Sequence, residues 1–411
     1  MEKKAAQSLC KLDAPRGFFA GVLEAGFSIF ILLIAIRFFE APNYCKAMIA
    51  AGSPIGLILS PFLMSLWANS RIQEPRKCSI LMAVCSAFIF AASLSPDVVF
   101  FTGCILLAQI CLSQIPSLMI SVYSQLYSKK ERGFRLSITL VLSACGGMVS
   151  SYYLGKYLDL EHADPRLALW AISGSALCCG VFHFFMPKVK GVQPYLSRLV
   201  RFRNIIKIPN EDRLFLRILI AWMILGFGVI MTFPLRIEYL ANKQGLNFSN
   251  EEIAFIGVSI FFTTKVVSVL LCGKLFDRVH FMRFRIALNL VMLTAILIYF
   301  NAGTFLGVAI GTAIAGLGTG GANIAWNLWV TKLAPSGKES EYMGVHLFLT
   351  GVRGSTAPFL GYALLETFGY SGISILSAVL ILAATLIFLT TVNHPRFEER
   401  NISKVSHPSF C

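Results

Sequence analysis

Three ionisable residues lie inside long apolar stretches of the sequence, where a charged side chain is energetically unfavourable. They are Glu24, Lys265 and Arg353. A charged side chain at the centre of a bilayer costs about 2.5–3.5 kcal/mol on insertion scales, so it usually has a partner or a task. A guanidinium matches a carboxylate or phosphate in a bidentate way, and a buried carboxyl can carry a proton. Anion recognition and proton coupling are therefore one interpretation. A structural ion pair, Glu24–Lys265 or Glu24–Arg353, is the other.

Polar residues also recur at helical spacing within three apolar segments. Steps of three or four residues place each set on one face of a helix. The sets are Gln109, Ser113 and Ser117; Thr319, Asn323 and Asn327; and His346, Thr350 and Arg353. Such a stripe either lines a cavity or joins two helices, and the sequence leaves both alternatives open. The resulting candidate residues for substrate binding or coupling are Glu24, Lys265, Arg353, Asn323, Asn327, Gln109, His346 and Thr350.

The elements that must position these residues are predicted to be membrane-spanning helices. Of the 411 residues, 56% are hydrophobic and 14% are charged, whereas soluble domains are about 25% charged. Apolar stretches of about 20 residues, enough to cross a bilayer, recur along the chain, and lipid requires each span to satisfy its own backbone. Twelve helices are predicted: 17–39, 45–68, 77–95, 98–126, 134–156, 167–187, 214–240, 252–274, 284–301, 303–331, 341–366 and 370–392. Ser249 and Glu252 have the spacing of a capping box at the start of the eighth.

The basic residues predict the orientation. The formal net charge is +15, and most of the 36 Lys and Arg residues share one side if the N-terminus is cytoplasmic. Basic loops stay in the cytoplasm, so both termini are predicted there. Only Lys265 and Arg353 are expected deep within spans. This asymmetry explains the charge without a nucleic-acid partner. The eleven cysteines are scattered through apolar segments and are interpreted as packing residues.

The longest polar connection, residues 188–213, divides the chain into two halves. We expect an N-terminal six-helix half over 1–187, a cytoplasmic central loop, a C-terminal six-helix half over 214–392 and a cytoplasmic tail over 393–411. Short stretches of the halves match in order along the chain: Gly26-Phe27-Ser28 with Gly226-Phe227-Gly228, and Tyr153-Leu154-Gly155 with Phe359-Leu360-Gly361. Duplicated halves are a common transporter design.

The segment GKLFDRVHFMRFR, residues 273–285, resembles the G-x-L-x-D-R-x-G-R-R/K signature of the major facilitator superfamily. Gly273, Leu275, Asp277 and Arg278 match, and His280 stands where the second glycine is expected. The resemblance implies an all-α integral membrane fold, with twelve transmembrane helices in two pseudo-symmetric six-helix bundles. It also implies that the four matching residues belong to a gate that latches one conformation, so they are not substrate ligands.

These features together predict a secondary active transporter. It would move a small solute, with a weak preference for an anionic or zwitterionic one, by alternating access, and a proton is a candidate coupling ion. A non-transporting receptor or scaffold with the same bundle is the alternative. No enzyme, metal or cofactor motif is found, so none of these is predicted. We expect a monomer that contacts lipid and its solute in the cell membrane, which is the inner membrane if the source is Gram-negative.

Overall fold

The computed structural model describes residues 2–67, 70–128, 131–189, 202–335 and 337–397, and every regular element in these ranges is helical. The first half contains α1 (Glu2–Ala25), η1 (Gly26–Phe30), α2 (Ile31–Arg37), α3 (Asn43–Trp67), α4 (Glu74–Ser93), α5 (Val98–Leu126), α6 (Arg132–Leu158) and α7 (Pro165–Phe185). The second contains α8 (Phe202–Glu211), α9 (Arg213–Ile230), α10 (Thr232–Ala241), α11 (Asn250–Ala254), η3 (Phe255–Ile260), α12 (Phe261–Arg278), α13 (Phe281–Asn301), α14 (Phe305–Leu333) and α15 (Glu339–Leu389).

Twelve spans are confirmed once the last element is divided. Eleven helical stretches of the described residues are long and apolar enough to cross a membrane, and the last of them covers Glu341–Leu389. That stretch turns back at Gly369, which has φ 63° and ψ −178°. Glycine adopts a positive φ without the steric cost that a Cβ brings. This glycine therefore separates the eleventh span from the twelfth.

Two predicted boundaries are wrong in informative ways. The first helix begins at Glu2 instead of residue 17, so the basic N-terminal residues already lie on α1. The connection between the eighth and ninth spans is also much shorter than the segment 273–285, because α12 continues to Arg278 and α13 starts at Phe281. The capping box of Ser249 and Glu252 is confirmed, with both reciprocal hydrogen bonds present.

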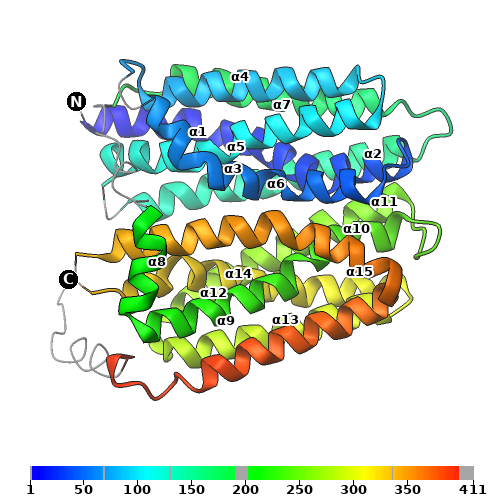
Figure 1. Ribbon diagram of the computed structural model, residues 1–411. Helices are drawn as coiled ribbons and strands as arrows, with labels where there is room; N and C mark the ends of the chain where they lie inside the picture. The colour runs from blue at the N-terminus through cyan, green and yellow to red at the C-terminus, as the bar shows by residue number, and fades with distance from the viewer. Residues whose placement is uncertain (1, 68–69, 129–130, 190–201, 336, 398–411) are drawn as a thin grey trace.

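The helices separate into two bundles that lie side by side. Figure 1 shows α1–α7 in the upper bundle and α9–α15 in the lower one. The start of α1, helix α8 and the end of α15 lie at the same end of the molecule, which we call the terminal end, and α8 runs across it (Figure 1). The principal contacts between the bundles join α3 to α15, and α6 to α11 and η3. The connections between α2 and α3 and between α10 and α11 mark the opposite end, called the far end.

Close approach of α1 and α6 depends on small residues. A Cβ on Gly21 would collide with the backbone of Ser143, and one on Gly146 would collide with the backbone of Phe18. Helices in a membrane gain stability from such contacts, because lipid provides no hydrophobic drive for association. This packing fixes α1, the helix that carries Glu24, against the rest of its bundle.

Candidate functional site

A cavity of about 1000 Å³ lies between the two bundles, and residues of both line it. Most of its wall is apolar or aromatic. The polar side chains on the wall include Arg16, Glu24, Gln109, Tyr123, Arg236 and Thr312. Small-molecule sites have this composition, since apolar surface supplies contact area while a few polar groups fix orientation. The lining residues Tyr123 and Leu136 lie near the terminal end, and Leu240 and Ile253 lie near the far end, so the cavity runs along much of the interface between the bundles.

Two π-helical segments meet beside the cavity. η1 interrupts the first span, η3 interrupts the eighth, and both contribute lining residues. They touch where a Cβ on Gly257 of η3 would collide with the side chain of Ile29 on η1. π-Helical turns are rare and occur often at functional sites. The two bundles therefore approach each other closely here, because Gly257 has no side chain at the contact.

The structure brings Glu24 and Lys265 together across the two bundles. Lys265 Nζ lies 3.2 Å from Glu24 Oε1, and the two side chains are 27% and 45% exposed. Glu24 lines the cavity, whereas Lys265 is not among its lining residues. The Glu24 carboxylate is thus reachable from the cavity, unlike that of a fully buried structural bridge.

Gln109 also lies on the cavity wall, where the sequence pattern places it as a candidate. Its Nε2 donates to the carbonyl of Ile49 at 2.8 Å, and Gly52 leaves the room that its side chain occupies. Thr312, on α14 in the other bundle, faces the same cavity, and its buried hydroxyl has no hydrogen-bond partner among the described residues.

Arg236 is a cavity cation that the sequence pattern placed outside the membrane core. It lies on α10, and its guanidinium is over the rings of Phe233 and Tyr299 at 5.2 and 5.7 Å. Within the described part of the chain Arg236 forms no ion pair, and its buried Nε has no hydrogen-bond partner. An arginine that lies on the wall of a cavity without an acidic partner can bind an anionic group of a ligand.

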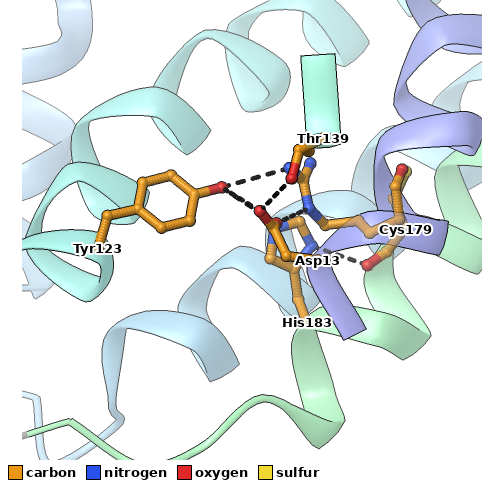
Figure 2. Close-up of polar contacts among 6 residues, drawn as sticks. Asp13, Tyr123, Thr139, Cys179 and His183 are labelled. Atoms are coloured by element: carbon orange, nitrogen blue, oxygen red, sulfur yellow. Dashed lines mark hydrogen bonds and ion pairs between the residues drawn. The ribbon is translucent and has the colours of Figure 1, made fainter. Parts of the chain in front are cut away.

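Arg16, at the terminal end of the cavity, is neutralised within its own bundle. Figure 2 shows Asp13 surrounded by partners from several helices. Arg16 Nε donates to Asp13 Oδ1 at 2.7 Å, Tyr123 donates to the same carboxylate at 3.0 Å, and Thr139 donates to Oδ2 at 2.8 Å. His183 and Cys179 complete the group, with His183 Nδ1 2.7 Å from the carbonyl of Cys179 (Figure 2). We call Asp13, Arg16, Tyr123 and Thr139 the aspartate cluster.

Arg353 is absent from the cavity wall, although the sequence makes it a leading candidate. It is 5% exposed, and its Nη1 donates to the carbonyl of Trp222 on α9. A Cβ on Gly226 would collide with its guanidinium, so this glycine provides the space. His346 and Thr350 lie two turns and one turn before it on α15 and are also missing from the wall. The polar stripe of α15 therefore faces the interior of its own bundle.

The remaining candidates lie elsewhere. Asn323 is exposed and is not among the residues that line the cavity. The side chains of Asn327, Asp277 and Arg278 lie outside the described part of the structure. Gly273 and Leu275 lie on the last turns of α12, with Leu275 exposed. The gate assigned to this segment by resemblance stays a prediction.

Polar contacts between the bundles gather at the far end. Lys46 Nζ lies 2.8 Å from Glu238 Oε1, and both residues are buried. Asn242 donates to the same oxygen at 2.8 Å. Arg37 reaches across to the carbonyls of Ala241 and Phe248 and to the side chain of Asn250. These bonds close the far end.

Buried cations were the main features that sequence reasoning missed. Arg16, Arg236 and Arg285 lie near the ends of predicted spans and were not chosen as candidates, yet each is at least partly buried. One available signal was the Asp13-x-x-Arg16 spacing, which pairs opposite charges on one helix face. For Arg285, the signal was Asn289 one turn later, which accepts from its Nε at 2.9 Å.

Comparison with known proteins agrees with this architecture. The sequence profile of the Major Facilitator Superfamily matches residues 17–345 and 218–409. The chain therefore belongs to the major facilitator superfamily. No curated protein sequence matches it.

Several solved structures share its fold. A point mutant of the nucleoside transporter NupG is similar with a TM-score of 0.77 and 11% identity, covering 93% of this chain and 99% of that one. A POT family transporter in complex with a thioalcohol-conjugated peptide gives 0.71 and 12%, covering 96% of each chain. The inward-open xylose transporter XylE from E. coli gives 0.66 and 14%, covering 93% and 95%.

Proposed function

We propose that this protein is a secondary active transporter that moves a small solute across the membrane by alternating access. The observation that carries the proposal is the cavity of about 1000 Å³ that both bundles line. A site at the interface of two repeated halves is the arrangement that allows a solute to be exposed first to one side and then to the other. In this interpretation the halves, 1–187 and 214–392, rock about the Ile29–Gly257 contact.

The charge distribution supports a cavity that faces the cytoplasm. Basic loops are retained in the cytoplasm, and they gather at the terminal end, near which the lining residues Tyr123 and Leu136 lie. The far end is held by the Lys46–Glu238 pair and the contacts of Arg37. We therefore infer an inward-facing state with both termini cytoplasmic, in the cell membrane.

The cavity supports a solute with an apolar body and an anionic or zwitterionic group. Phe27, Phe261 and Phe262 offer ring surface, and Arg236 offers a cation without an acid partner among the described residues. The structurally similar proteins include a nucleoside transporter and a xylose transporter, which are chemically different cargoes. The fold alone therefore does not determine which substrate is bound. The residues that line this cavity must determine it.

Glu24 is the proposed proton-coupling group. Its carboxylate is paired with Lys265 across the bundles, and Glu24 lines the cavity. Protonation of Glu24 would remove the attraction between the two and weaken one contact between the bundles. Coupling of this kind predicts that Glu24→Gln transports without moving protons. If liposomes containing Glu24→Gln still acidify together with substrate entry, Glu24 is not the essential carrier.

The substrate can be found and the transport proposal tested in two steps. Thermal unfolding of the purified protein against a panel of metabolites identifies a ligand, because binding to the folded state raises its apparent stability. Uptake of that ligand is then measured in proteoliposomes. Arg236→Gln should abolish uptake, whereas Arg166→Gln, at an exposed arginine on α7, should not. Binding without any uptake by the wild-type protein would instead favour a receptor or scaffold.

A further inference from the structure

A second group of buried cations lies in the C-terminal bundle, apart from the central cavity. Arg285 on α13 and Arg353 on α15 are each 5% exposed. No ion pair of the described residues includes either of them. The two guanidinium groups also repel one another. Arginine stays protonated in proteins, so both positive charges persist in a medium where an unpaired charge is costly.

Both arginines are held in place by neighbours that do not neutralise them. Arg353 donates through Nη1 to the carbonyl of Trp222. Arg285 donates through Nε to Asn289 at 2.9 Å, and its guanidinium lies over the Trp222 ring at 4.4 Å. Asn289 is itself anchored by a bond of 3.0 Å to Thr385. These contacts leave Arg285 Nη1 and Arg353 Nε buried without a partner among the described residues.

Four further polar groups lack partners in the described structure: three belong to residues of the same contact network, and the fourth belongs to Thr350, one turn before Arg353 on α15. They are Trp222 Nε1, Trp329 Nε1, His346 Nε2 and Thr350 Oγ1. The His346 ring is 5.7 Å from Trp222 and 5.0 Å from Trp329, and the two indoles are 5.8 Å apart. Together with Arg285 and Arg353 these four residues form what we call the arginine–tryptophan cluster. Each indole and guanidinium nitrogen is a donor only.

So many orphaned donors in one place point to a missing acceptor. Buried polar groups are nearly always hydrogen-bonded, and leaving one unsatisfied is destabilising, the more so if it is charged. Trp222, Trp329 and His346 are 3%, 0% and 1% exposed, so bulk water does not reach them. Neutral water could accept some of these bonds, but it would leave two positive charges uncompensated. An anion accepts the bonds and compensates the charge.

We propose that the arginine–tryptophan cluster binds a small inorganic anion of the halide type, with chloride as the probe. The rings of the cluster lie at van der Waals packing distances, which suits a monatomic ion better than an oxoanion such as phosphate. None of the six residues lines the central cavity, so the site is separate from the proposed transport path. Helices α9, α13, α14 and α15 all contribute to it, so the anion would tie four helices of one bundle together.

The test uses thermal unfolding of the purified full-length protein. Chloride replaces gluconate at constant ionic strength, and the wild-type Tm should rise and saturate, since a ligand of the native state stabilises it. Arg285→Gln and Arg353→Gln each remove a charged hydrogen bond, which contributes about 1.5–3 kcal/mol, so the apparent Kd for chloride should weaken about tenfold or more. Arg71→Gln, at an exposed arginine, is the matched control and should keep the wild-type response.

A second measurement uses only the wild-type protein, so it tests the proposal even if the variants fail to fold. Crystals of the wild-type protein grown in bromide should show an anomalous peak within hydrogen-bonding distance of both Arg285 and Arg353. The proposal is overturned by a wild-type Tm indifferent to chloride, by equal chloride responses in all variants, or by bromide crystals without that peak. A Tm that responds to phosphate and not to chloride would also overturn the assignment to a halide. None of these outcomes depends on whether a solute is transported.

Discussion

The two bundles bury arginines in opposite ways. In the N-terminal bundle, Arg16 sits against Asp13, whose carboxylate also receives bonds from Tyr123 and Thr139 (Figure 2). In the C-terminal bundle, Arg285 and Arg353 have no acidic partner among the described residues. The comparison teaches that a buried cation alone does not mark a binding site. What separates the two cases is whether the fold supplies the counter-charge.

The largest expected effect comes from removing that counter-charge. Asp13→Asn leaves Arg16 buried without an anion, and breaking a buried pair by removing one partner typically costs about 3–5 kcal/mol. We expect a large drop in Tm, measured by thermal unfolding in detergent. The double variant Asp13→Asn/Arg16→Met should recover much of the loss. Equal stability of Asp13→Asn and the wild-type protein would show that Asp13 does not neutralise Arg16.

The second prediction concerns the space that holds Arg353. Gly226→Ala would place a methyl group where the guanidinium lies, and such overpacking typically costs about 1–3 kcal/mol. The chloride response proposed for the arginine–tryptophan cluster should weaken along with Tm. Gly174→Ala on α7 is the control, because nothing lies within 4 Å of its added Cβ. If both variants unfold at the same temperature, Gly226 does not position Arg353.

A smaller effect is expected from Tyr123→Phe. The hydroxyl of Tyr123 donates to Asp13 at 3.0 Å, and Arg16 Nη2 lies 3.3 Å from the same oxygen. Its removal takes away one bond to the carboxylate but leaves the ion pair, so we expect about 1–2 kcal/mol of destabilisation. Thr139→Val should behave similarly. A loss as large as that of Asp13→Asn would mean that the hydroxyl, and not the charge of Asp13, stabilises Arg16.

The smallest effect concerns Asp212, the aspartate that begins the C-terminal bundle. Burial acts to raise its pKa, but bonds from the Phe215 amide, Arg396 and Tyr342 outweigh this and hold the pKa below its ordinary value. A carboxyl with a lowered folded-state pKa adds stability above its unfolded pKa, about 3.9, and loses it as pH falls through the folded value.

The stability difference between wild-type protein and Asp212→Asn should therefore be constant from neutral pH to about pH 5. It should decline only below about pH 4, and with Arg396 32% exposed it should stay near 1 kcal/mol or less. Arg396→Gln should move the decline to higher pH. A difference that is independent of pH would exclude a charged role for Asp212.

Most of the fold could be predicted from the sequence, because lipid leaves few alternatives for a long apolar segment. The span 98–126 coincides with α5 at both ends, and the turn at Gly369 falls between the predicted eleventh and twelfth spans. The start of the first helix was missed because its first turns are polar. Hydropathy reports where a chain meets lipid, whereas α1 continues beyond that region.

The candidate site was predictable only in part, because sequence places a charge along a helix but not around it. Glu24 and Lys265 were identified from their depth in apolar segments, and they meet across the bundles. Arg353 was identified by the same argument but faces the interior of its bundle, since Gly226 opens a space there. Arg236 and Arg285 lie near span ends, where arginine is common, so depth alone gave no reason to select them.

The far end of the protein is closed by charge, and this affects how easily it opens. Lys46 and Glu238 are 7% and 2% exposed while they face each other at 2.8 Å. Separating them returns two ions to water, and the regained hydration offsets much of the lost attraction. An apolar contact of equal size would gain no favourable hydration on separation, since exposing apolar surface to water is unfavourable. If the proposed transport cycle opens this end, we therefore expect the pair to act as a reversible contact, stable while it is buried and easily separated once water enters.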